Sequence, residues 1–520
     1  MIKKLSKLTD LQLQKLFTII SIAIACQVIY IQHGWINDDS VLYFEMARLL
    51  SIGEWKQGIE LFNWPFYPAL ISIASKLTHL SIQSSAQLLD VIFFSVTTYS
   101  FINLIRLAGG NKATIISGAF LLLCSSYIVG DVLPMLLRDQ GFWAMYLTSL
   151  VYFIKFYRTQ KLGDALLWQV CAILAVLFRI EAITFLVCLP LILFKAHDLS
   201  LKQKITHYLT LNLIPICLFL LILSILVFSP TVHLSDFGRL EEVALIFPRM
   251  MTEIAAKFST KATVMGNQVL GVYFSEYGML GIIVSLASIL LIKVLGLIGW
   301  PLVGVLALSR SNCNVSQPIN ILQKDTRSIF CWTLTLSLLN AAVIIASVFV
   351  LSSRYIIAFG FIALILAAFQ LSPLLEEIAK TSNKIFWKRI ILLLLLAVIA
   401  YSGVKNLLPK QAGYTFEQDA IAYIKKQSVS NSKVFYVTPR SRYFAGAPYA
   451  GRGYDYWDYT KKAIEDGSIY QYSYLVINLD IDNEFPAKKK ILDEKLPQYS
   501  VVKEFYGYRN KKKIMIYLKN

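Results

Sequence analysis

The sequence predicts a mainly α-helical, polytopic membrane protein that carries a small α/β domain at its C-terminal end. Only 16% of its 520 residues are charged, whereas about 25% are charged in an average soluble domain. Hydrophobic residues make up 56% of the chain, and the mean hydropathy is +0.58. From about Lys410 onward the chain becomes polar and rich in tyrosine. This composition excludes a soluble globular body for most of the chain, and it also excludes an intrinsically disordered protein.

Apolar runs long enough to cross a bilayer recur along residues 1–409, which we predict to form the membrane domain. A spanning helix needs about 20 apolar residues. Four runs contain no Asp, Glu, Lys or Arg: 16–37, 205–235, 328–353 and 355–375. Shorter candidates lie at 84–105, 112–130, 140–155, 164–178, 182–195, 279–308 and 389–405. We predict about eleven spans and at most about thirteen, with 279–308 forming either one tilted helix or two short ones.

The distribution of basic residues predicts the orientation of these spans. Lys3 and Lys4 precede the first apolar run, and no cleavage-site pattern follows it, so we expect a retained helix with a cytoplasmic start. Five loops on the expected cytoplasmic side carry Lys or Arg: 106–112, 155–161, 195–204, 310–327 and 376–388. The net charge of +18 therefore reflects orientation in the membrane, and no nucleic-acid partner is expected.

Acidic residues gather instead in the two loops expected on the outer side, 33–83 and 230–277. The stretch 66–82 is apolar, but counting it as a span would place the later basic loops outside, so we expect a juxtamembrane helix there. With eleven spans the C-terminus is also outside. The location predicted is a bacterial inner membrane, with a cytoplasmic N-terminus and a periplasmic C-terminal domain.

Residues 410–520 predict a soluble outer α/β domain. A helix is expected at 415–427, and strands are expected at 434–438, 474–478, 500–505 and 513–518. Fifteen of the 28 tyrosines lie in this part of the chain. They could stack on a sugar or pack against the bilayer surface, and the second interpretation is favoured.

Neither the cysteines nor the histidines indicate a metal centre. The seven cysteines include no CxxC pair, and the five histidines are scattered along the chain. The sequence therefore indicates neither a zinc site nor a disulfide framework.

The candidate catalytic residues lie directly after the first predicted span. Asp38 and Asp39 are adjacent carboxylates. Carboxylates at a membrane face are costly to desolvate, so those that are present usually serve a function. The structural alternative is that Asp39 or Ser40 caps a helix over 41–51. Spacing alone leaves both interpretations open.

The first outer loop resembles that of the GT-C-fold glycosyltransferases, in particular the bacterial aminoarabinose–lipid A transferases and the protein O-mannosyltransferases. The similarity rests on Asp39-x-x-x-Tyr43-x-Glu45-x-Ala47-Arg48, Gly53-x-Trp55 and Trp64-Pro65-x-Tyr67-Pro68. Ser40 stands where those families have a second acid, and Asp38 supplies an acid on the other side of Asp39. Asn63-Trp64-Pro65 replaces their Lys-Pro-Pro.

Later motifs continue the resemblance in the same order. Asp131 and Arg138-Asp139 fall in the second outer loop, where these families also carry polar residues. Arg179-Ile180-Glu181-Ala182 is similar to their Arg-Pro-Glu-Gly element, and Arg354-Tyr355 is similar to their Arg-Tyr element.

The resemblance implies transfer of a hexosyl or pentosyl unit from an undecaprenyl- or dolichyl-phosphate carrier to a lipid, glycan or protein acceptor on the outer side. A carboxylate can take the acceptor's proton, and arginine has a planar fork that suits phosphate. Asp39 is then the expected base, with Asp38 supporting it or binding a metal. The remaining roles implied are donor-phosphate binding by Arg179, Arg354 and Arg138, and acceptor binding or support by Glu45, Asp131, Asp139, Glu181 and Tyr43. These groups are expected to converge on one cavity.

Several alternatives stay open on the sequence. A metal-binding DxD would need a residue between the two acids, so dependence on a divalent cation is undecided. The arginines could form ion pairs that only stabilise polar groups near the membrane face. A transporter or lipid flippase without chemistry is the main competing function, although no internal repeat of the transporter kind is present. A surface-glycan polymerase or ligase is the third candidate.

Overall fold

The computed structural model describes residues 8–195, 199–229, 231–245, 250–310, 322–379, 386–409, 413, 415–427, 432–451 and 455–520. Most of the expected cytoplasmic loop 310–327 and parts of loops 195–204 and 376–388 lie outside these residues. The chain divides into two compact units, which are described separately. The first comprises 1–26, 88–133 and 138–406, and the second comprises 27–87, 134–137 and 407–520.

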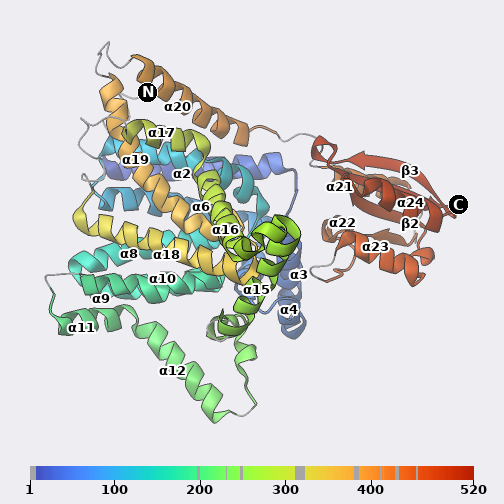
Figure 1. Cartoon of the computed structure of the whole chain (residues 1–520), viewed down its shortest axis with the longest axis horizontal. Helices are drawn as coiled ribbons and strands as arrows, with labels where there is room; N and C mark the ends of the chain where they lie inside the picture. The colour runs from blue at the N-terminus through green and yellow to red at the C-terminus, as the bar shows by residue number, and fades with distance from the viewer. Residues whose placement is uncertain are drawn as a thin grey trace. The chain divides into compact units, whose positions relative to one another are not determined.

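The first unit is a bundle of helices, among which α8, α18 and α19 are prominent in Figure 1. Two of its helices, α2 (Asp10–Gln32) and α6 (Ile82–Leu107), have one end in the second unit. The other helices are α7 (Lys112–Leu123), α8 (Asp139–Thr159), α9 (Leu162–Phe178), α10 (Ile183–Cys188), α11 (Leu201–Leu211), α12 (Leu213–Phe228), α13 (Leu240–Ala244), α15 (Ala255–Val264), α16 (Gly278–Ile298), α17 (Trp300–Arg310), α18 (Lys324–Val348), α19 (Ile357–Ala379) and α20 (Phe386–Asn406).

Seven helices among the described residues are long and apolar enough to cross a membrane, or eight if the bent pair α11 and α12 forms one span. All seven overlap runs that the sequence predicts as spans, and the mainly helical membrane architecture is confirmed. Two further predicted spans coincide with α8 and with the 17-residue apolar helix α9. The total of about eleven stays a prediction.

Two of the predicted runs have a different local structure, and a third, 279–308, adopts one of its two expected forms. Residues 182–195 form only the short helix α10 followed by a 3-10 segment, Leu189–Lys195, in which Pro190 lacks the backbone N–H that an α-helix would use. The run 205–235 bends by 65° between α11 and α12, where Pro215 lies in the first turn of the new helix. The stretch 279–308 is two helices, because Gly299 has a φ of +92° and ends α16.

Close packing of α8 against α9 fixes the start of α8. The ring of Phe153 meets the ring of Trp168 with centroids 5.0 Å apart, and Phe178 packs at the other end against Gly141. A Cβ atom at Gly141 would overlap the Phe178 ring, so only glycine fits at this contact. Because Asp139 and Arg179 adjoin these two residues in sequence, this contact also sets the spacing of two candidate site residues.

We expect Gly141→Ala to destabilise the protein by about 1–3 kcal/mol, since the added methyl group forces Phe178 out of its place. The control is Gly163→Ala in α9, where no atom lies within 4 Å of the new Cβ. Unfolding of both variants in mixed micelles measures the difference. Equal stability of the two variants would show that the contact is not tight.

The second unit combines loop 33–83 with the C-terminal α/β part. Its helices are α3 (Asp38–Ser51), α4 (Trp55–Leu61), α5 (Phe66–Thr78), α21 (Phe416–Gln427), α22 (Pro439–Ala445), α23 (Tyr456–Glu465) and α24 (Phe485–Lys495). The helix α5 lies where the juxtamembrane helix is expected, and α21 lies where the first C-terminal helix is expected.

The four predicted strands form one sheet with the order β1-β2-β4-β3. Their bounds are β1 (Val434–Tyr436), β2 (Tyr474–Asp480), β3 (Tyr499–Tyr506) and β4 (Lys512–Lys519). The strand β1 runs parallel to β2, while β4 is antiparallel to both β2 and β3. Alternation along β2 puts Leu475 and Ile477 in one core and Val476 in a second core with α21.

Contacts far apart in sequence join the two parts of the second unit. The Gln418 side chain donates to the carbonyl of His33 at 3.0 Å, and Tyr443 Oη donates to the Gln83 side chain at 3.2 Å. The Tyr443 ring also packs on Phe44 of α3, with ring centroids 5.6 Å apart. The C-terminal part therefore contacts loop 33–83 directly.

Candidate active site

The two adjacent acids Asp38 and Asp39 form the first turn of α3. The helix is capped by Asn37, whose side chain accepts a hydrogen bond from the Asp39 backbone N–H at 2.9 Å. The sequence interpretation that Asp39 or Ser40 caps a helix starting at 41 is therefore wrong, because the chain becomes helical three residues earlier. The helix dipole favours negative charge at this end.

Residues of the C-terminal part hold the Asp38 carboxylate. Tyr456 Oη donates to Oδ2 of Asp38 at 2.9 Å, and Arg440 Nη1 lies 3.5 Å from Oδ1. Arg440 also forms a bidentate pair with Glu417, at 2.6 and 3.0 Å. The Asp38 side chain is 41% exposed, although its Oδ1 atom is buried.

The pKa values of both Tyr456 and Arg440 are raised in this contact. Burial raises the pKa of Tyr456, and the negative charge of Asp38 raises it further. For Arg440, burial alone would lower the pKa, but Glu417 and Asp38 outweigh burial and raise it. Arg440 therefore stays charged and Tyr456 stays a neutral donor at any physiological pH.

The other first-loop candidates have structural contacts. Tyr43 is 5% exposed and meets Tyr67 edge-on, with ring centroids 5.4 Å apart. Tyr67 Oη in turn donates to the carbonyl of Leu136 at 3.4 Å. Glu45 pairs with Arg48 one turn along α3, at 2.8 Å. Asp39 itself is half-buried.

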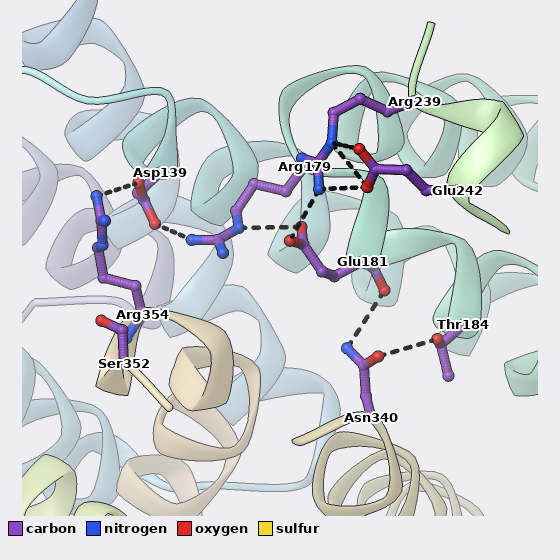
Figure 2. Close-up of polar contacts among 9 residues, drawn as sticks. All are labelled: Asp139, Arg179, Glu181, Thr184, Arg239, Glu242, Asn340, Ser352 and Arg354. Atoms are coloured by element: carbon purple, nitrogen blue, oxygen red, sulfur yellow. Dashed lines mark hydrogen bonds and ion pairs between the residues drawn. The ribbon is translucent and has the colours of Figure 1, made fainter. Parts of the chain in front are cut away.

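The first unit carries a second set of charged groups, which Figure 2 shows. Asp139 is the first residue of α8, Arg179 directly follows α9, and Glu181 lies in the 3-10 turn Ile180–Ala182. Arg354 comes from the 3-10 turn Ser353–Ile356, and Arg239 precedes α13. All five of these charged residues therefore lie at helix ends or in short turns.

Arg179 is the centre of this set and is almost fully engaged. Its Nη1 donates to Asp139, its Nε lies 3.4 Å from Glu181, and its guanidinium stacks on Tyr355 at 4.6 Å from the ring centroid. The exposed fractions of Arg179 and Asp139 are 5% and 2%. Burial of these charges is tolerated because each carboxylate contacts an arginine.

Two further arginines flank the centre. Arg354 Nη1 lies 3.7 Å from the second oxygen of Asp139, and Arg239 Nη2 lies 3.9 Å from Glu181. Arg239 also pairs with Glu242 at 2.9 Å. Arg354 is the most exposed of the three arginines in Figure 2, at 29%. It can therefore reach a ligand with the least rearrangement.

Two remaining candidates are placed near this set. Arg138 occupies the N-cap position of α8 and acts electrostatically on Glu181. Asp131 is exposed and lies within electrostatic reach of Tyr127, as do Asp139 and Arg354.

An apolar pocket of the first unit includes Tyr127. It encloses about 280 Å³ and is lined mainly by apolar residues of α16, α17, α19 and α20. Its polar lining includes Ser125, Ser126, Ser402 and Lys405.

The sequence interpretation did not find four of these residues. They are Arg239, Glu417, Arg440 and Tyr456, none of which belongs to a recognised motif. The only signal at Arg239 is the pair of acids that follows it in the loop. The structure brings Arg179, Arg354, Asp139 and Glu181 together in ion pairs, while their roles stay a prediction. That these residues and the Asp38–Asp39 pair line one cavity stays a prediction. Within the described residues, no three His, Cys, Asp or Glu side chains form a group that could hold a metal ion.

Comparisons with known proteins identify the fold. No protein-family model matches the chain, and its sequence matches no curated protein. Crystal structures of ArnT from Cupriavidus metallidurans, one in the apo state and one bound to undecaprenyl phosphate, do match it. In both cases the TM-score is 0.50 at 11% identity, over 96% of this chain and 97% of ArnT. The chain has the ArnT fold.

The ArnT fold confirms the expected GT-C architecture, in which a multi-pass helical part is combined with a small C-terminal domain. The similarity extends over nearly the whole of both chains.

Proposed function

We propose that the protein transfers a sugar from a polyprenyl-phosphate carrier to an acceptor on the outer face of the membrane. The observation that carries the proposal is the buried Asp139–Arg179–Glu181 set with Arg354 at its exposed side. Membrane proteins rarely bury charges in this way unless a function requires them. The ArnT structure bound to undecaprenyl phosphate supports a lipid-linked donor.

The donor phosphate would be held by arginines that the buried acids orient. Arg179 is engaged on both sides and stacked on Tyr355, so in this proposal it positions Asp139 and Glu181. Arg354, which lies 3.7 Å from Asp139 and is 29% exposed, would contact the phosphate, with Arg138 as a second cation. In this proposal the apolar pocket that includes Tyr127 accommodates the isoprenoid chain.

The chemistry requires a base for the acceptor, and Asp39 is the proposed one. The acceptor oxygen attacks the anomeric carbon, the bond from that carbon to the phosphate oxygen breaks, and the proton of the acceptor hydroxyl passes to Asp39. The polyprenyl phosphate leaves with the bonding electron pair, and the arginines stabilise its added charge. Asp38, held by Tyr456 and Arg440, would keep the first turn of α3 in position.

In this proposal the N-terminus is cytoplasmic, residues 1–409 form the membrane domain, and the C-terminal domain at 410–520 is periplasmic. The test is transfer by the purified protein in nanodiscs from a panel of undecaprenyl phosphates that carry radiolabelled hexoses or pentoses. Formation of a covalent glycosylated product supports the proposal. Movement of the labelled lipid across the bilayer without any such product would support the flippase alternative instead.

We expect Arg354→Gln to raise the KM for the lipid-linked donor by a factor of about 10 to 100, because it removes a charged hydrogen-bond donor to the phosphate. The matched control is Arg389→Gln in α20, where the arginine is exposed and belongs to neither charged set. Steady-state kinetics against donor concentration measure the effect. An unchanged KM in Arg354→Gln would remove Arg354 from the donor site.

A further inference from the structure

A polar pocket in the second unit lies at the carboxyl ends of β1 and β2. Thr438 follows β1, Asn478 and Asp480 end β2, and all three line the pocket. The pocket has a volume of about 70 Å³ and is partly open to solvent, so it can hold only part of a ligand. In open α/β sheets this edge is the usual place for a ligand.

The lining of this pocket carries balanced charge. Three carboxylates and three cations contribute to it: Glu417, Asp455, Asp480, Arg440, Lys488 and Lys512. Arg440 is paired with Glu417 at 2.6 Å, and Lys512 lies 3.7 Å from Asp480. A pocket for a phosphate would have an excess of cations, and a pocket for a metal ion would have an excess of acids. Balanced charge suits a neutral ligand that can both donate and accept hydrogen bonds.

Two further features narrow the class of ligand. Asn478 Oδ1 is buried and has no hydrogen-bond partner, so it can accept a hydrogen bond from a ligand hydroxyl group. Tyr456 and Trp457 place aromatic side chains in the same lining. A sugar offers hydroxyl groups that both donate and accept hydrogen bonds, together with an apolar ring face that can stack on an aromatic side chain.

We propose that this pocket binds one neutral sugar unit of the acceptor. The inference rests on the proposed transferase function, because it identifies the acceptor as a saccharide or a glycosylated molecule. The donor would bring its phosphate with it, and the balanced lining does not favour that group. The aromatic content of this domain then includes sugar contacts, which the sequence interpretation had placed second to packing at the bilayer.

The pocket is joined to the acids of α3. Arg440 and Tyr456 both line it, and the same two side chains contact the Asp38 carboxylate at 3.5 and 2.9 Å. A sugar seated here is therefore fixed relative to the first turn of α3, where Asp39 also lies. Binding in the pocket would orient the next hydroxyl of the acceptor for attack.

The test is saturation-transfer NMR on the full-length protein in nanodiscs, with the methyl glycosides of glucose, galactose, mannose and N-acetylglucosamine as probes. We expect saturation transfer to at least one glycoside. Asn478→Leu and Lys488→Ala should each weaken its binding by a factor of about five or more, since each removes a polar partner. The matched control is Lys490→Ala, on the same helix α24 but with a side chain that is 77% exposed and outside the pocket.

The outcomes separate this inference from the proposed function. Absence of saturation transfer to any glycoside, or displacement of a bound glycoside by inorganic phosphate, would overturn the sugar pocket even if the protein transfers sugar. If the protein binds a glycoside but forms no product from any lipid-linked donor, the sugar-binding pocket is supported and the proposed transferase function is contradicted. Unfolding curves of both variants show whether a weakened signal reflects binding alone, and Asn478→Leu is not expected to unfold the sheet, because it removes an unpaired buried oxygen.

Discussion

Replacement of Asp39 by asparagine is expected to lower the kcat of sugar transfer by a factor of about 10² to 10⁴, the range that a positioned general base contributes. Asparagine keeps the size of the side chain and cannot take the acceptor's proton. The KM for the lipid-linked donor should change little, because the donor phosphate is assigned to arginines of the first unit. Single-turnover transfer from the radiolabelled donor measures the chemical step.

The control for this experiment is Glu54→Gln, which neutralises an exposed acid of the same loop that only accepts a hydrogen bond from Gln57. Asp38→Asn provides the discriminating comparison. If Asp38→Asn loses transfer and Asp39→Asn keeps it, the base is Asp38, and the assignment made here is overturned. Full activity in both variants would remove the acid pair from the chemistry altogether.

The second large effect concerns Arg179. Arg179→Met should destabilise the protein by about 3–5 kcal/mol, because it leaves the buried carboxylates of Asp139 and Glu181 without their main cation. The free energy of unfolding in mixed micelles, measured by titration with sodium dodecyl sulfate, gives the difference. The loss should exceed that of any other single arginine substitution in the charged set, since Arg179 is the least exposed member.

Arg48→Met is the control for Arg179→Met, because Arg48 is 52% exposed and its pair with Glu45 should contribute less than about 1 kcal/mol. A further variant tests the cause of the loss. When Asp139→Asn and Glu181→Gln are added to Arg179→Met, the uncompensated charges disappear and part of the stability should return. A loss below about 1 kcal/mol in Arg179→Met itself would contradict the buried ion network.

Local patterns account for what the sequence predicted correctly. Uninterrupted apolar runs identified the spans at α18 and α19, and alternation identified strands such as β2. The same local reasoning was wrong about the start of α3, because the helix is capped by Asn37, which immediately precedes Asp38 and Asp39. It also treated 182–195 as a possible span, although Pro190 and the 3-10 segment interrupt it.

Local sequence patterns predict only some of the contacts in the candidate site. Arg179 and Glu181 are two residues apart, so a motif could carry both. Tyr456 reaches Asp38 across 418 positions, and no period or spacing in the sequence encodes that contact. It depends on how β1 and β2 place α22 and α23, which is a property of the folded sheet. Contacts of this kind could be inferred only after the second unit was assembled.

The composition of the second unit has a consequence for synthesis of the protein. The ribosome makes Asp38 418 residues before it makes Tyr456, which at the usual elongation rates is a delay of about 20 to 80 s. During that time α3 has already been translated, while neither Arg440 nor Tyr456 exists to hold its first turn. The acid pair therefore acquires its final setting only near the end of translation.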